Sequence, residues 1–361
     1  MNVWPDRRIL ELFGIEHPII QAPMANSAAA ALAIGAAQGG GLGSLACASL
    51  SPERVQEEVT LFRAATGRPL NLNFFCHRPP GHDPDCERNW KQLLAPYYEE
   101  HGIDPSAAVT APVRAPFDDI AASLVEELRP EIVSFHFGLP EGRLVARVRA
   151  SGSRIISSAT TVEEARWLES RGCDAIIAQG SEAGGHRGMF LTEDIATQVG
   201  TMALVPQIVD AVKVPVIAAG GIADGRGIAA AFALGAAAVQ IGTAYLFCPE
   251  SIIPPVHRAA LLAARDAQTM LTNIFTGRPA RGIANPIMRE LGPISAAAPD
   301  FPLAGGALAP LRAKTEPVGS GDFMPLWSGQ AAPLGRECPA AELTARLAED
   351  ALARFSPHLH R

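Results

Sequence analysis

A histidine within a run of glycines is the residue best suited to chemistry in this chain. His186 lies in the segment QGSEAGGHRG, residues 179–188. Glycines let a backbone approach a flat ligand, and an imidazole that titrates near neutrality can abstract a proton or, once protonated, hold an anion. Alone, such a residue is more often a surface histidine in an exposed loop. His186 is therefore a catalytic candidate only if the fold places it at a ligand site.

Two further glycine-rich segments are suited to binding phosphate. They are AAGGIADGRG at residues 218–227 and QIGTAY at residues 240–245. Backbone N–H groups in such loops, or at the start of a helix, can surround a phosphate. The pair Gly220 and Gly221 alone more often marks only a tight turn. The two segments together favour a phosphate site.

Three polar side chains interrupt apolar runs, and each could serve either the structure of the protein or a ligand site. His136 in VSFHFG is as often a hydrogen-bonded core residue as a functional one, and Asn73 and Gln179 are as often parts of a turn as contacts to a heterocycle. The histidines, aspartates and cysteines at residues 76–86 match no common metal spacing, so no metal is predicted. A Gly-x-Ser-x-Gly elbow is also absent, which disfavours covalent hydrolysis.

The elements that must position these residues are short apolar runs alternating with helical patterns, as in parallel β/α units. The runs lie at residues 18–21, 41–45, 70–75, 132–137, 154–158, 175–179, 214–219 and 237–242, with helices predicted at 161–170 and 225–234 among others. Eight such units predict an α/β fold of the (β/α)8 TIM-barrel type. An open doubly wound sheet would need a phosphate loop after its first strand, and QAPMANS does not have the G-x-G-x-x-G pattern.

The domain organisation follows from two stretches outside the repeat. We expect a barrel at residues 1–250 with an insertion at 76–117 after the third strand. A small helical lid at 251–311, with a helix at 257–267, should lie over the barrel mouth. Residues 312–361 should return to the barrel. Barrel active sites lie at the carboxyl ends of the strands, where His186 and the phosphate loops would meet.

Composition narrows the possible partners. A net charge of −7 and a pI near 5.7 offer no basic surface for nucleic acid. Six cysteines lack C-x-x-C spacing, and neither a signal peptide nor a membrane-spanning run is recognisable. We expect a cytoplasmic enzyme that acts on a small molecule, and its oligomeric state stays open.

Taken together, the motifs resemble the nitronate monooxygenases, formerly 2-nitropropane dioxygenases, and in particular the bacterial class I branch. The resemblance covers almost the whole chain. Its elements are IIQAPM (19–24), GGLGSL (40–45), NLNFFCH (71–77), VSFHFG (133–138), AQGSEAGGHRG (178–188), AAGGIADGRG (218–227), QIGTAYL (240–246), FTGRPARG (275–282) and LWSGQ (326–330).

The resemblance implies FMN as cofactor and His186 as the catalytic histidine, with His136 a second active-site candidate. The residues it implies for FMN binding are Ala22, Pro23, Met24, Asn73, Gln179, Gly184, Gly221, Gln240, Ile241, Gly242 and Thr243. The family commonly continues QAPMA with a glycine, where this chain has Asn26 and Ser27. Lys314 falls in a region that holds active-site residues in some members.

The resemblance also implies the reaction. An alkyl nitronate such as propionate 3-nitronate would give one electron to FMN, and the flavin semiquinone would pass it to O2, forming a carbonyl compound with nitrite or nitrate. His186 would act as base or anion holder. Two alternatives remain: an NAD(P)H-dependent flavin reductase, such as an enoyl-acyl-carrier or quinone reductase, on a related barrel, and a flavin- or phosphate-binding barrel without catalysis.

Overall fold

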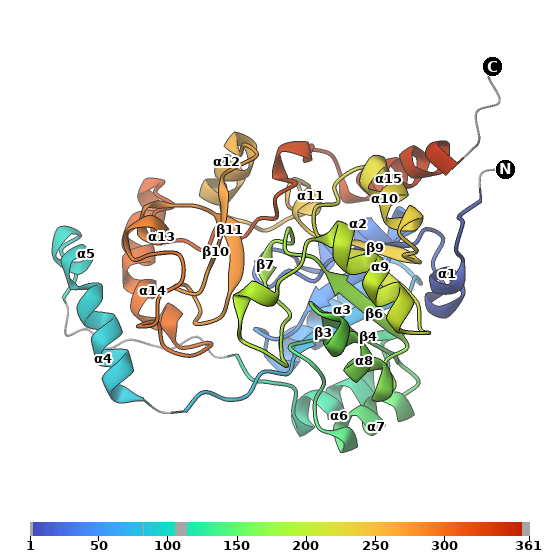
Figure 1. Ribbon diagram of the computed structural model, residues 1–361, viewed down its shortest axis with the longest axis horizontal. Coiled ribbons are helices and arrows are strands. Elements are labelled where there is room, and N and C mark those ends of the chain that lie inside the picture. Colours follow the sequence, from blue (N-terminus) through green and yellow to red (C-terminus); the bar gives the residue numbers. More distant parts are fainter. Residues whose placement is uncertain (1–2, 82, 105–113, 356–361) are drawn as a thin grey trace.

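The computed structural model describes residues 3–81, 83–104 and 114–355. Eight parallel strands form one sheet in the order β1-β9-β8-β6-β5-β4-β3-β2. A parallel bridge between Ile20 and Leu42 joins β1 to β2, so the sheet curls into a nearly closed barrel (Figure 1). Within the described ranges no helix is long and apolar enough to cross a membrane.

The barrel strands confirm the (β/α)8 prediction. They are β1 (Ile19–Gln21), β2 (Gly43–Ala46), β3 (Leu70–Phe75), β4 (Ile132–His136), β5 (Arg154–Ala159), β6 (Ala175–Gln179), β8 (Val216–Ala219) and β9 (Ala238–Ile241). Each lies within two residues of its predicted run. Alternation along each strand sends one set of side chains inside the barrel and the other toward the helices. Ile20, Ile156 and Ile217 belong to the inner cluster, which Ile9 and Phe13 of α1 (Arg8–Phe13) join.

Eight helices surround the sheet. They are α2 (Ala30–Gln38), α3 (Pro52–Ala65), α6 (Asp119–Leu128), α7 (Gly142–Ala150), α8 (Val162–Ser170), α9 (Thr201–Ala211), α10 (Gly225–Ala233) and α15 (Ala340–Phe355). The predicted helix at 161–170 begins where Thr161 accepts a hydrogen bond from the Glu164 N–H, as a capping residue should. α15 packs against α2 and α10, so the last barrel helix comes from the end of the described chain.

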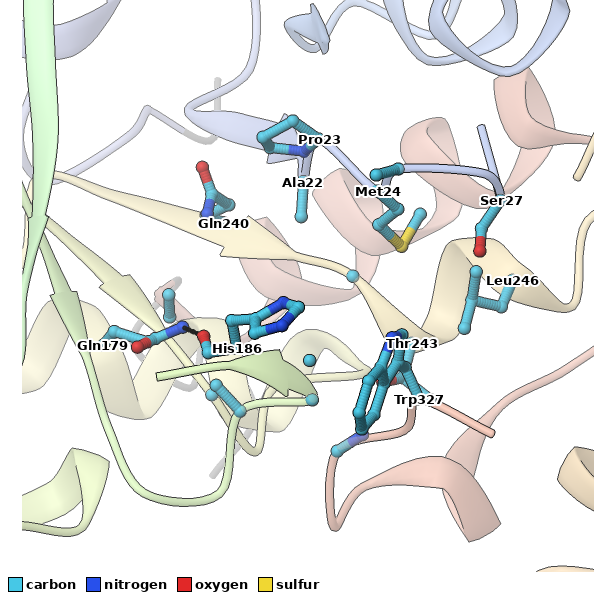
Figure 2. A pocket seen from close by; sticks show the side chains of 18 of the residues that line it. Ala22, Pro23, Met24, Ser27, Gln179, His186, Gln240, Thr243, Leu246 and Trp327 are labelled. Carbon is cyan, nitrogen blue, oxygen red and sulfur yellow. Dashed lines mark hydrogen bonds between the residues drawn. The ribbon is translucent and has the colours of Figure 1, made fainter. Parts of the chain in front are cut away.

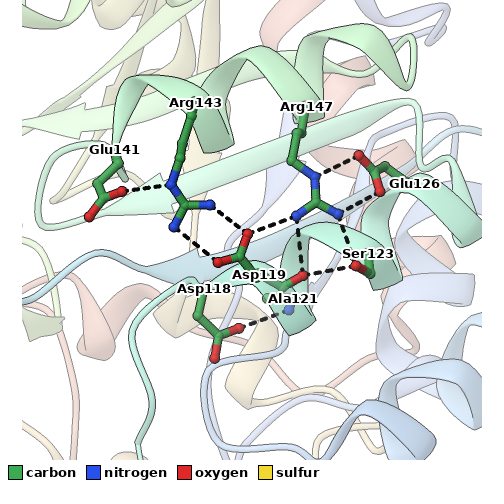
Figure 3. A network of polar contacts seen from close by, with 8 residues as sticks. All are labelled: Asp118, Asp119, Ala121, Ser123, Glu126, Glu141, Arg143 and Arg147. Atoms are coloured by element: carbon green, nitrogen blue, oxygen red, sulfur yellow. Dashed lines mark hydrogen bonds and ion pairs between the residues drawn. The ribbon is translucent and has the colours of Figure 1, made fainter.

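On the outer surface, α6 and α7 are joined by a network of ion pairs (Figure 3). Arg143 and Arg147 both contact Asp119, and Arg147 also forms a bidentate pair with Glu126. These side chains are largely exposed, and pairs screened by solvent contribute little to stability. The network orients two helices, and none of its side chains lines the cavity described below.

The insertion and the lid form a single outlying unit, which lies to the left of the barrel in Figure 1. The insertion contributes α4 (Pro84–Leu93) and α5 (Ala95–Glu100), and the lid contributes α13 (Pro286–Glu290) and α14 (Ala304–Thr315). Trp90 and Tyr98 of the insertion share a core with Leu308 and Leu311 of α14. The Trp90 indole N–H donates to the Ala304 carbonyl at 3.0 Å.

The segment after β9 is only partly helical. After the short α11 (Thr243–Leu246), the predicted helix at 257–267 is observed as α12 (Pro255–Ala263). Two strands follow, β10 (Thr269–Thr272) and β11 (Ala280–Ile283), and these were not predicted. β11 also pairs with β7 (Gly185–His186), which belongs to the loop after β6. The lid is therefore fastened to the loop that carries the candidate histidine.

Candidate active site

One cavity of about 250 Å³ opens at the carboxyl ends of the barrel strands. It brings together residues that are far apart in the sequence (Figure 2). Of the residues singled out by the sequence, those that line it are Ala22, Pro23, Met24, Asn26, Ser27, Asn73, His136, Gln179, Gly184, His186, Gly220, Gly221, Gln240, Gly242 and Thr243. Ile241 does not line it; its side chain is buried in the core between sheet and helices.

His186 does not lie in an exposed loop, as the glycine-rich sequence suggested. It is half-buried in β7, where it pairs with Ala280 of β11. The left-handed φ of +71° at Gly185 lets the chain turn into this strand. Aromatic rings surround the imidazole, with ring centroids of Phe301 at 5.3 Å and Trp327 at 5.5 Å. Phe301 belongs to the predicted lid, and Trp327 belongs to the segment that follows the lid.

Two side chains hold the backbone of His186 in place. The Nε2–H of His136 and the side-chain amide of Gln179 both donate to the His186 carbonyl, at 3.2 and 2.9 Å. Gln179 also accepts from the Gly188 N–H at 2.7 Å, and Nδ1 of His136 bonds to the Ser158 hydroxyl at 3.1 Å. Both side chains therefore position β7 in this structure; their predicted contacts to cofactor or substrate stay predictions.

The surroundings of His186 keep its imidazole neutral. Burial lowers its pKa well below 6.5, and the positive charges of Arg114 and Arg278 lower the pKa further. The sequence alone suggested an imidazole with a pKa near neutrality. In the structure the charged imidazolium is disfavoured, because it would be buried away from water and close to other positive charges. Nε2 lies 2.9 Å from the Thr276 hydroxyl, and Nδ1 has no hydrogen-bond partner in the described part of the chain. Nδ1 is therefore the ring atom available to a ligand.

Buried histidines should make the protein lose stability in mild acid. Burial lowers the pKa of His136 and of His257 from 6.5 to about 4. The unfolded chain binds protons first, so the contribution of each to the free energy of unfolding is complete above pH 6.5 and is lost between pH 6.5 and 4, by up to roughly 3 kcal/mol per residue. Urea unfolding across this range checks it. His257→Gln, which can still donate to the Trp327 carbonyl, should give a shallower slope; an identical slope would contradict the assignment.

The residues at the predicted cofactor site fit a flavin nucleotide. The side-chain oxygen of Gln240 is buried and has no hydrogen-bond partner among the described residues. In the same ranges, the backbone N–H groups of Gly221 and Ile222 have no acceptor. Asp224 already caps α10 by accepting from Arg226 and Gly227. A phosphate would therefore meet the loop amides, and a heterocycle edge would meet the Gln240 amide.

Gly184 has a packing reason for being glycine. A side chain there would collide with the backbone of Ser328 and Gly329 in the LWSGQ segment. Gly329 in turn donates its N–H to the Thr243 hydroxyl at 2.9 Å. This close approach joins the loop after β6 to the wall that follows β9, whether or not Gly184 also contacts a cofactor.

Asn26 stands where a glycine was expected, and it adopts the left-handed backbone conformation that this loop requires. Its φ is +59°, in the left-handed region that glycine adopts freely and asparagine tolerates. The next residue, Ser27, accepts hydrogen bonds from the Ile252 N–H and the Ser251 hydroxyl, both at 3.1 Å. The backbone conformation, rather than the chemistry of the side chain, explains why asparagine can replace glycine at residue 26.

Substitutions at Asn26 should therefore sort by backbone preference. Asn26→Gly should leave stability and cofactor content unchanged. Asn26→Val should destabilise the protein by about 1–2 kcal/mol, because a β-branched residue is strained at positive φ. Urea denaturation of both variants measures the difference, and equal losses would show that the Asn26 side chain itself matters.

Several cavity residues were missed from sequence. Arg114 lies in the insertion, His257 lies in the lid, and Arg312 and Trp327 lie in the segment that follows the lid. The sequence predicted a lid over the barrel mouth and a C-terminal segment that returns to the barrel, but it did not identify which of their residues line the cavity; the LWSGQ motif was the one local signal. Lys314, by contrast, is exposed on α14 and does not line the cavity.

Known proteins share this architecture and sequence. Residues 6–350 match the family model described as nitronate monooxygenase. The chain is 43% identical to the nitronate monooxygenase of Pseudomonas aeruginosa over 346 residues, 95% of this chain and 98% of that protein. Its identity to the nitronate monooxygenase of Paraburkholderia phytofirmans is also 43%, over 94% of each chain.

A solved structure agrees with these relatives. The nitroalkane oxidase of Streptomyces ansochromogenes superposes with a TM-score of 0.86 at 37% identity, covering 96% of this chain and 98% of that one. The match extends over the barrel and the outlying unit alike. The chain therefore belongs to the nitronate monooxygenase family of oxidoreductases.

Proposed function

We propose that this enzyme oxidises alkyl nitronates, such as propionate 3-nitronate, with O2, using FMN, to a carbonyl compound with nitrite or nitrate. The observation that carries the proposal is the charge around His186: the neutral imidazole faces a cavity where the nearby ionised groups that lower its pKa are Arg114 and Arg278. Such a site favours an anion over a neutral molecule. A nitronate is an anion, and the names of the relatives support the same substrate class.

The chain would hold FMN through groups that have no partner within the protein. Gly221 and Ile222 would donate backbone N–H groups to the phosphate, and Gln240 would bond the heterocycle edge. Bound FMN supplies an electron acceptor that O2 can reoxidise. Ala22, Pro23 and Met24 would lie along the ring, and the enclosure by Trp327 and Phe301 would exclude water from the nitronate.

His186 would act through Nδ1, in one of two tautomers. If the Thr276 hydroxyl donates to Nε2, then Nδ1 carries the proton and donates a hydrogen bond to the nitronate. If Nε2–H donates to Thr276, whose hydroxyl can in turn donate a hydrogen bond to the Arg278 carbonyl 3.4 Å away, then Nδ1 is a free base. The first arrangement suits a nitronate and the second suits proton removal from a neutral nitroalkane.

Oxygen consumption tests the proposal. Purified, FMN-loaded protein should consume O2 with propionate 3-nitronate in the absence of nicotinamide nucleotides and release nitrite or nitrate. Anaerobic mixing with NADPH provides the contrast: rapid bleaching of the flavin together with no nitronate turnover would indicate a reductase. Zero turnover without bleaching, by a fully loaded sample, would indicate a binding protein.

A further inference from the structure

The guanidinium of Arg114 is a positive charge at the cavity that has no counter-ion among the described residues. Its Cζ lies 5.6 Å from the ring centroid of Phe301, and that ring is 5.3 Å from the ring of His186. In the described ranges no carboxylate forms an ion pair with Arg114. Arg312, which also lines the cavity, is by contrast paired with Glu316 at 2.9 Å.

Leaving a partly buried guanidinium unpaired is unfavourable. Burial lowers the pKa of Arg114, which shows that the protein withdraws solvent from the charge without supplying a counter-ion. Arg278 differs, because it donates to the Met189 carbonyl at 2.7 Å and lies 4.3 Å from the ring centroid of Phe137. A planar guanidinium matches a carboxylate with two parallel hydrogen bonds, so an acidic ligand would satisfy Arg114.

We propose that Arg114 binds the carboxylate of acidic nitronates and makes the enzyme prefer them over uncharged alkyl nitronates. This inference rests on the proposed function, with the nitronate group at His186 and the carboxylate at Arg114. The Phe301 ring lies close to both residues, with its centroid 5.3 Å from the centroid of the His186 ring and 5.6 Å from Arg114 Cζ.

The charge of Arg114 could also act on the nitronate group instead of the carboxylate, and an experiment can distinguish these two roles. Arg114 could instead stabilise the nitronate group itself, and then its loss would affect every nitronate equally. Two substrates distinguish these roles: propionate 3-nitronate, which has a carboxylate, and propyl-1-nitronate, which has the same number of carbons without one.

The test measures O2 uptake by wild type, Arg114→Met and Arg114→Lys with both substrates. Arg114→Met should lower kcat/KM for propionate 3-nitronate by about 10- to 100-fold, mainly through KM, and change that for propyl-1-nitronate by less than about threefold. Arg114→Lys should recover part of the loss. Arg346→Met, an exposed change of equal charge on α15, should alter neither.

Equal losses on both substrates, or no loss on either, would overturn the assignment. Calorimetric binding of 3-nitropropionate, the conjugate acid of that nitronate, keeps the test independent of turnover. If wild type oxidises neither nitronate, the proposed function fails, yet binding still decides the role of Arg114. Weaker binding to Arg114→Met than to Arg346→Met supports it, and equal binding contradicts it.

Discussion

Replacing His186 by asparagine is expected to abolish most turnover while the protein keeps its FMN. With a neutral nitroalkane, where a base must remove a proton, kcat/KM should fall by about 10²- to 10⁴-fold. With a preformed nitronate the fall should be smaller, about 10- to 100-fold, because only a hydrogen bond from Nδ1 to the anion is lost. Steady-state O2 uptake with each substrate form provides the measurement.

The two substrate forms decide how His186 works. A large loss with nitroalkane and a small one with nitronate would identify a base, and similar losses would identify an anion holder. His101→Asn is the matched control, since His101 ends α5 in the outlying unit and does not line the cavity. Unchanged turnover by His186→Asn with both forms would remove the residue from the mechanism.

A substitution at Thr276 tests whether His186 acts as a base or as an anion holder without changing the imidazole itself. It is buried, and its hydroxyl is the partner of Nε2. Thr276→Val removes that partner, so no hydrogen bond at Nε2 fixes which ring nitrogen of His186 carries the proton. If the base role holds, the nitroalkane reaction should be impaired more than the nitronate reaction, as for His186→Asn.

Replacing Gly242 by valine is expected to prevent FMN binding without unfolding the protein. The φ of −108° at Gly242 is open to any residue, so no backbone strain is introduced. A Cβ there would stand 3.5 Å from Ala22 Cβ and 3.6 Å from Met24 Sδ, at the cavity wall where the flavin ring is proposed to lie. The valine methyl groups would extend into that space, and a packed site does not accommodate added volume cheaply.

The measurement is the flavin content of the purified protein, read from its visible spectrum after incubation with excess FMN. We expect less than about a tenth of the wild-type content, with a melting temperature within a few degrees of flavin-free wild type. Gly67→Val is the matched control, because Cβ at Gly67 meets nothing within 4 Å. Full flavin content in Gly242→Val would show that the ring lies elsewhere.

Local pattern was sufficient for the barrel and for most of the proposed cofactor site. Each strand is a short apolar run, and parallel strands bring their carboxyl ends to one edge. Residues near the ends of different strands, such as Gln179 at the end of β6 and Gln240 in β9, therefore meet in one cavity. The glycine-rich loops could be located for the same reason, since their function depends on backbone groups whose position the neighbouring strands determine.

By itself, then, the sequence determined the barrel, the edge at which the cavity opens and His186 as a residue of that edge. Tertiary structure decided the state and surroundings of His186: its place in β7, the Phe301 and Trp327 rings beside it, and the charge of Arg114. The insertion, the lid and the segment after the lid provide these groups through contacts between segments far apart in the chain. Such contacts have no periodicity to reveal them, and the pKa of an imidazole depends on burial and charges that exist only once the chain has folded.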